Sequence, residues 1–220
     1  MSDRYSAAHT SLRTAGIMVV FTLAFTAMMS QTYRMTRPAI EASAQDEKMR
    51  LIDDVLPRGS YDNALLDDFV AVGPTPQLGL EAGGHVYRAR RDGTPAALVF
   101  EAVARDGYGG KIQLVVAVSA DGRLGGVRVT GHKETPGLGD YIDPKKDRNK
   151  SQPWIGQFAG VSLADVAPDP WKVRRDGGRF AYRVGATISA RAVTNAAGRA
   201  VEYATENRDA LFAAPAGSRI

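Results

Sequence analysis

The stretch IQLVVAVSADGRLGGVRV, residues 112–129, decides the fold class predicted for this 220-residue chain. Residues 112–118 are rich in β-branched side chains, which is typical of a strand. The sequence Ala-Asp-Gly-Arg at 120–123 is a turn signal, and residues 124–129 then predict a second strand that returns beside the first. An antiparallel sheet is therefore expected.

Further segments extend this prediction. Residues 85–89 and 97–100 predict two shorter strands, and residues 154–158 predict a short helix. The last helix is expected over about 189–211, because small and apolar side chains recur there on one face: Val193, Ala197, Ala200, Val201 and Ala204. The predicted fold class is α+β, an antiparallel sheet packed with helices.

An apolar segment near the N-terminus predicts a membrane anchor in front of this domain. Residues 16–33 read GIMVVFTLAFTAMMSQTY, and 20 uncharged residues separate Arg13 from Arg34. A membrane-spanning helix needs roughly 20 apolar residues. A buried core helix would show a polar stripe, and a cleaved signal peptide would end in an A-x-A-like site, which residues 28–32 do not provide. A single retained transmembrane helix is favoured, and its flanking arginines are balanced and leave its orientation open.

The expected domain organisation follows from these segments. It comprises a short tail at 1–15, the anchor at 16–34, a juxtamembrane helix with a connector at 35–80, and a folded domain at 81–220. Pro38 stands where a new helix could begin, since a proline in the first turn has no donor to lose. Glycines and prolines between 58 and 80 predict an irregular connector.

The composition excludes several classes of site. The chain has no cysteine, so disulfides, thiolate-bound metals and thiol nucleophiles are excluded. The histidines His9, His85 and His132 are far apart, and no metal site is expected. The net charge is +4, and basic residues form two small clusters: Lys145, Lys146, Arg148 and Lys150, and Lys172, Arg174, Arg175 and Arg179. Each cluster fits a solvated loop as well as a phosphate-binding surface, and the lack of interleaved aromatics argues against nucleic-acid binding.

Two segments carry residues with chemical potential. The loop GHKETPGLGD at 131–140 directly follows a strand, and its glycines allow backbone N–H groups to approach a ligand closely. Leu138 between Gly137 and Gly139 is suited to contact a flat group, although an ordinary glycine-rich turn would have the same composition.

The second segment, VGATIS at 184–189, opens the last helix. Small residues there leave backbone N–H groups at the positive end of the helix dipole, which is a favourable place for a phosphate. Alternatively Thr187 or Ser189 is the N-cap of the helix, and the two interpretations are compatible.

The run GYGGKI at 107–112, the loop HKETPGLGD at 132–140 and GATIS at 185–189 resemble the G subunit of the Rnf electron-transport complex. The C subunit of the sodium-translocating NADH:quinone reductase is a more distant relative with the same type of FMN-binding domain. The resemblance implies that a flavin transferase joins FMN through its phosphate to the Thr187 hydroxyl. It also implies a cofactor-binding set around Thr187: Glu134, Thr135, Gly137, Leu138, Gly139, Gly185, Ala186 and Ser189.

The resemblance further implies a membrane-anchored electron carrier, one subunit of an ion-translocating ferredoxin/NAD oxidoreductase complex. Such a subunit has no catalytic residue or substrate site of its own. Its expected partners are the other Rnf subunits, the flavin transferase and membrane lipid. Its expected place is the bacterial inner membrane, with the FMN-binding domain of residues 81–220 on the periplasmic side.

Two positions depart from the family pattern. Val184 stands where the family usually has Ser or Thr, and Ala181 where it usually has Asp. Both positions belong to what the transferase recognises in relatives, so either change could slow the attachment of FMN. An alternative function is a flavin-free, membrane-tethered assembly or sensory module of the same fold. A free-standing flavin reductase is less well supported, because no G-x-G-x-x-G stretch follows a strand and opens a helix.

Overall fold

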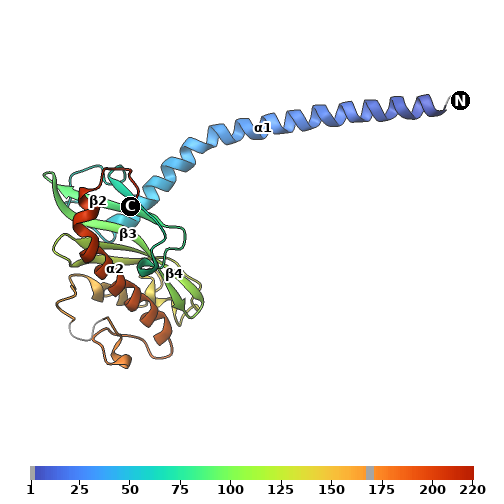
Figure 1. Ribbon diagram of the computed structural model, residues 1–220. Coiled ribbons are helices and arrows are strands. Elements are labelled where there is room, and N and C mark those ends of the chain that lie inside the picture. Colours follow the sequence, from blue (N-terminus) through green and yellow to red (C-terminus); the bar gives the residue numbers. More distant parts are fainter. Residues whose placement is uncertain (1–2, 167–170) are drawn as a thin grey trace. The chain divides into compact units, whose positions relative to one another are not determined.

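The computed structural model of the chain describes residues 3–166 and 171–220. The chain divides into two compact units, Met1–Met49 and Arg50–Ile220. Helix α1 spans Asp3–Asp53 (Figure 1). Its residues up to Met49 belong to the first unit, and its last residues, 50–53, belong to the second. By length and composition α1 can cross a membrane, and large apolar side chains such as Phe21 and Leu23 are exposed along it. The predicted N-terminal apolar helix is confirmed.

Two predictions for the segment before the sheet are wrong. Pro38 lies inside α1 and does not begin a separate helix. A proline removes one backbone hydrogen bond from a helix. The hydrogen-bonded turns on both sides of Pro38 keep α1 continuous. Residues 58–80 are also not wholly irregular, because they contain strand β1, Phe69–Val72, and the 3-10 helix η1, Pro76–Leu78. Four residues are too few to show the alternation of apolar and polar side chains by which a strand is recognised in a sequence. Strand β1 is defined by its pairing with β2.

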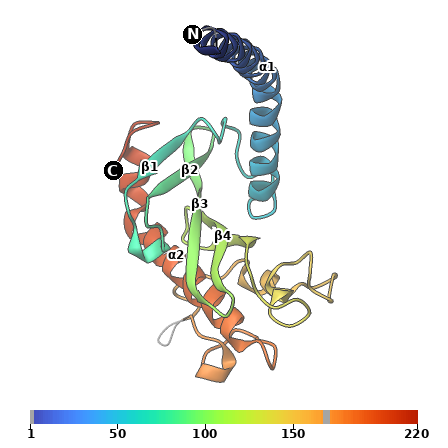
Figure 2. The same cartoon turned by 90° about the vertical axis from the view of Figure 1, so that its right-hand side faces the viewer.

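The second unit is built on an antiparallel sheet with the strand order β1-β2-β3-β4-β5 (Figure 2). The predicted strands are confirmed and longer than expected: β2 is Gly84–Arg91, β3 is Thr94–Gly107, β4 is Gly110–Ser119 and β5 is Leu124–Gly131. The register aligns one row of core side chains across the sheet, Val86, Phe100, Val116 and Val127. This row is part of the hydrophobic core.

Both faces of the sheet are covered. Helix α2, Thr187–Ala213, packs on β3 and β4 and confirms the predicted last helix. Successive residues of a strand point to opposite faces, so Ala117 faces away from the Val116 side. On that second face Val55 lies against the backbone of Gly125 and Gly126. Antiparallel sheets with two covered faces need apolar residues at consecutive positions, as β4 has at 116–118.

One end of the core consists of aromatic side chains under α2. Trp171 stacks on Phe180 with ring centroids 5.0 Å apart, and Phe158 lies 5.0 Å from Phe180. The predicted helix at 154–158 is the 3-10 helix η3, Trp154–Phe158, which contributes Phe158 to this group. Trp171 also lies directly against Gly198 of α2, where a Cβ atom would clash with the Trp171 side chain.

Replacing Gly198 by alanine tests this contact. Alanine is a better helix former than glycine by about 1 kcal/mol, but here the added methyl group would push on a buried indole. We expect Gly198→Ala to lower the free energy of unfolding by about 1–3 kcal/mol, measured by urea denaturation. Gly156→Ala is the matched control, because a Cβ atom at Gly156 meets nothing within 4 Å. Equal stability of the two variants would contradict the packing described.

Candidate functional site

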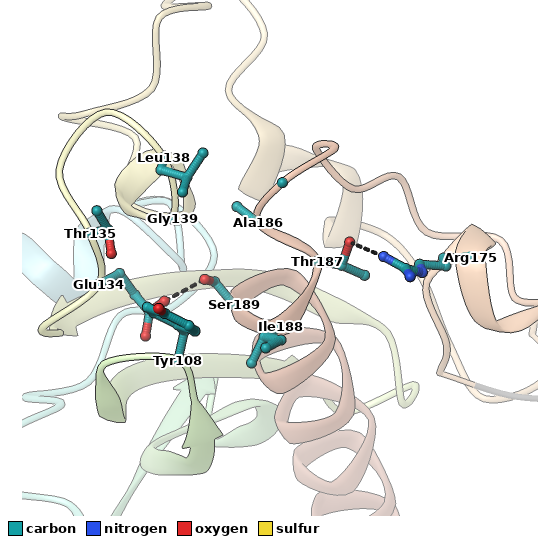
Figure 3. A pocket seen from close by; sticks show the side chains of 11 residues that line it. Tyr108, Glu134, Thr135, Leu138, Gly139, Arg175, Ala186, Thr187, Ile188 and Ser189 are labelled. Carbon is teal, nitrogen blue, oxygen red and sulfur yellow. Dashed lines mark hydrogen bonds between the residues drawn. The ribbon is translucent and has the colours of Figure 1, made fainter.

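A cavity of about 260 Å³ lies where four segments of the second unit meet. These segments are the turn between β3 and β4, the loop that follows β5, the short segment around Arg175, and the first turn of α2 with the residues just before it (Figure 3). The residues that line it are Tyr108, Glu134, Thr135, Leu138, Gly139, Arg175, Gly185, Ala186, Thr187, Ile188 and Ser189. Segments far apart in sequence thus form one site.

The cavity collects almost all the residues singled out from the sequence. Of the nine residues predicted to bind a cofactor, all but Gly137 line it. Gly137 has a φ of +74°, so it shapes the loop through its backbone. Tyr108, Arg175 and Ile188 were missed as site residues. Tyr108 lies in the family-like run GYGGKI at 107–112, and Arg175 lies in a basic cluster. Neither pattern predicts that the two residues line the same cavity.

A buried carboxylate joins three of these segments. The Glu134 side chain is only 4% exposed. Its Oε1 accepts a hydrogen bond from the backbone N–H of Gly109 at 2.9 Å, and its Oε2 accepts one from the hydroxyl of Ser189. The backbone N–H of Glu134 in turn donates to Nδ1 of His132 at 3.1 Å. Glu134 therefore fixes the loop both to the β3–β4 turn and to α2.

The close approach of these segments depends on a glycine. A Cβ atom at Gly139 would lie 2.7 Å from the Ser189 hydroxyl oxygen and 2.9 Å from Glu134 Oε2. Such contacts are shorter than van der Waals distance, so any larger residue would separate the loop from the helix. The hydrogen bond between Glu134 and Ser189 can therefore form only with glycine at position 139.

The first turn of α2 has no side-chain cap. Its N-cap residue is Ala186, and neither Thr187 nor Ser189 supplies a capping hydrogen bond, so the N-cap alternative is wrong for both. Ser189 donates to Glu134, and the Thr187 hydroxyl accepts a hydrogen bond from Arg175 Nη1 at 3.4 Å. The positive end of the helix dipole is consequently left without a side-chain acceptor, which favours an anion there.

A tyrosine supports the turn that leads into α2. Gly185 has a φ of +90°, a conformation that favours glycine. The Tyr141 hydroxyl accepts a hydrogen bond from the Arg183 N–H at 3.2 Å and donates one to the Ala186 carbonyl at 3.4 Å. Burial raises the pKa of Tyr141, so its hydroxyl keeps the proton that it donates.

An ion pair holds the same turn from its other side. Arg183 pairs with the buried Asp147, and its guanidinium lies 4.6 Å from the centre of the Tyr141 ring. Burial by itself would raise the pKa of Asp147, but hydrogen bonds from the backbone of Trp154 and Asn149 and the charge of Arg183 together lower this pKa. Asp147 is therefore ionised at neutral pH and orders the residues that precede Thr187.

Apolar side chains are exposed at the cavity. Tyr108, Leu138 and Ile188 all line it and all remain exposed. Exposed apolar side chains beside buried polar groups are suited to a ligand with a flat apolar part and a polar end. Val184, by contrast, is 90% exposed and does not line the cavity, and Ala181 packs on the core.

The sequence comparisons agree with this site. The family model of the RnfG N-terminal region matches residues 1–55, and that of the FMN-binding domain matches residues 107–202. The chain is 42% identical to the G subunit of the ion-translocating oxidoreductase complex of Pseudomonas aeruginosa over 92% of each chain. It is 40% identical to the corresponding protein of Pseudoalteromonas atlantica over 90% of each chain. It is 38% identical to that of Vibrio cholerae over 94% of this chain and 96% of the relative.

The chain belongs to the G-subunit family of the Rnf complex. The FMN-binding domain matched in this Rnf subunit contains every residue that lines the cavity. The cavity also fits FMN chemically. It combines exposed apolar side chains for a ring system with a cation, a hydroxyl and a helix N-terminus for a phosphate.

The role of Ser189 in this Rnf subunit can be tested by its removal. Ser189→Ala leaves Glu134 Oε2 buried without its hydroxyl donor, so we expect the free energy of unfolding to fall by about 1–3 kcal/mol. Thr187→Ala removes a hydroxyl in the same helical turn whose hydrogen bond is long, and should change stability by less than about 1 kcal/mol. Urea denaturation of both variants in detergent measures the difference. A loss no greater for Ser189→Ala than for Thr187→Ala would contradict the role given to Glu134.

Proposed function

We propose that this protein is a membrane-anchored electron-carrier subunit of an Rnf-type ion-translocating ferredoxin/NAD oxidoreductase, with FMN bound as a phosphoester at Thr187. The observation that carries the proposal is the position of Thr187. Its hydroxyl lies in a cavity-lining turn at an uncapped helix N-terminus, within hydrogen-bond reach of a guanidinium. When bound, FMN would supply the redox chemistry, and the protein would supply position and charge.

The size of the cavity supports covalent attachment. Sites for drug-sized ligands have volumes of about 300–1,000 Å³, and the cavity of about 260 Å³ lies just below this range. Part of FMN would therefore remain outside, and the apolar contacts of Leu138, Ile188 and Tyr108 would cover only part of the ring. A covalent bond retains the cofactor where such contacts alone would let it exchange.

The attachment reaction places few demands on the protein itself. The bond that forms joins Thr187 Oγ1 to the phosphorus of the FMN half of a flavin dinucleotide donor. The bond that breaks joins that phosphorus to the bridging oxygen, and the hydroxyl proton leaves with the released nucleoside monophosphate. The flavin transferase would catalyse this step, and the net gain is FMN minus one water. Thr187 is only 6% exposed, so the transferase must reach it through the cavity or after a local opening of the turn at Gly185.

The departures at Val184 and Ala181 do not weaken the cofactor site. Val184 projects into solvent, and the backbone of Ala181 is held by Gln157 and Trp154. Neither residue lines the cavity. Their expected effect is on recognition by the transferase. The alternative function is a flavin-free assembly or sensory module, and the mass measurement below tests it.

Intact mass of the full chain, expressed in membranes with an active flavin transferase, tests the proposal. We expect the protein to gain the mass of FMN minus water and to fluoresce in a denaturing gel. Thr187→Ala should abolish both signals, whereas Thr130→Ala, an exposed threonine on β5 outside the cavity, should retain them. An unmodified mass for the unsubstituted chain would overturn covalent attachment. Flavin absorbance of the native protein would then distinguish non-covalent FMN from the flavin-free module.

We also propose that the anchor comprises residues 16–34 and that the FMN-binding domain predicted at 81–220 lies on the periplasmic side. The absence of cysteine from the sequence makes this simple to test. A single cysteine at the exposed Lys146 should react with a membrane-impermeant maleimide in intact cells. A single cysteine at His9, before the anchor, should react only after the cells are lysed. The reverse pattern would place the domain in the cytoplasm.

A further inference from the structure

Arg175 occupies a distinctive place in the cavity. Among the described residues that line it, Arg175 is the one with a cationic side chain. Its Nη1 donates to the Thr187 hydroxyl oxygen at 3.4 Å, and Figure 3 shows the guanidinium directed toward that hydroxyl from beside α2. The sequence placed Arg175 only in a cluster of four basic residues, with a solvated loop as one explanation.

The local structure holds Arg175 in this place. Arg175 belongs to the 3-10 helix η4, Arg174–Asp176. Asp176 forms a bidentate ion pair with Arg191 of α2, whose two hydrogen bonds measure 2.6 and 2.8 Å. Arg191 follows Thr187 by four residues, so both lie on the same face of α2. The backbone that carries Arg175 is therefore tied to the helix face that presents Thr187.

We infer that Arg175 binds the charged oxygens of the phosphate at Thr187, both while the phosphoester forms and afterwards. This inference rests on the function proposed above. A guanidinium donates two parallel hydrogen bonds to phosphate oxygens, which a hydroxyl cannot do. The attached phosphate is a diester with one negative charge, and Arg175 matches it with one positive charge.

The geometry also suits the formation of the bond. Arg175 donates to Thr187 Oγ1, so it occupies a lone pair of that oxygen and leaves the hydroxyl proton free to depart. As Oγ1 joins the phosphorus, the guanidinium can move to the non-bridging oxygens a short distance away. Because Arg175 is the cationic side chain among the described residues that line the cavity, it becomes the main side-chain ligand for the phosphate.

The test compares Arg175→Ala and Arg175→Lys with Arg174→Ala in the full chain. Arg174 is the adjacent exposed arginine, it does not line the cavity, and its removal changes the net charge equally. The first measurement is the initial rate of FMN attachment by purified flavin transferase. The second is the ³¹P resonance of the phosphodiester in protein that has been fully loaded by long incubation.

We expect Arg175→Ala to slow attachment by about tenfold, Arg175→Lys to recover most of the rate, and Arg174→Ala to stay within about twofold of the unsubstituted chain. The ³¹P resonance should move in Arg175→Ala and not in Arg174→Ala. If Arg175→Ala fails to load at all, the resonance of loaded Arg175→Lys is compared instead, and a shift there that is absent from Arg174→Ala would also support the inference.

Two results would overturn it. Equal rates and equal ³¹P resonances for Arg175→Ala and Arg174→Ala would show that Arg175 does not touch the phosphate. A slow rate for Arg175→Ala with an unmoved resonance would show that Arg175 serves the encounter with the transferase alone. Failure of the unsubstituted chain to accept FMN at Thr187 is a different result, because it removes the proposed function itself.

Discussion

The hydrogen bonds of the Glu134 carboxylate are the constraint on which the rest of the site depends. One oxygen is bound to the β3–β4 turn at Gly109 and the other to α2 at Ser189. A buried carboxylate loses the hydration that it has in water, and each donor offsets part of that loss. The loop and the helix must therefore stay close enough to satisfy both oxygens, and this closeness shapes the cavity that Thr187 lines.

The same arrangement separates the charges of the cavity. The negative charge of Glu134 lies on the Ser189 side of the first turn of α2, and the positive charge of Arg175 lies on the Thr187 side. Neither hydroxyl caps the helix, because α2 begins at Thr187 and Ala186 holds the N-cap position. An anion is thus favoured at Thr187 by the guanidinium and the helix dipole together. On the Glu134 side, apolar and backbone surfaces remain for the neutral part of a ligand.

The predictions from sequence succeeded where the signal was local. The β-branched run at 112–118, the turn at 120–123 and the periodic face of α2 are patterns within one element, and all three appear in the structure. The same reasoning failed where a neighbour decides the outcome. Strand β1 exists through its pairing with β2, and Pro38 is carried by the long helix around it. The N-cap alternative for Thr187 and Ser189 was wrong for another reason, because α2 already begins at Thr187 and Ala186 holds the N-cap position.

The sequence by itself determined the α+β class, the apolar N-terminal segment and the two motifs around Glu134 and Thr187, since composition, periodicity and glycine placement are properties of the chain alone. Only the tertiary structure decided that these motifs meet in one cavity, that Arg175 also lines this cavity, and that Val184 does not line it. The physical reason is that hydrogen bonds and ion pairs act over a few ångströms in space, whatever the separation along the chain. Arg175 lies twelve residues from Thr187, and an ion pair between Asp176 and Arg191 brings the two together.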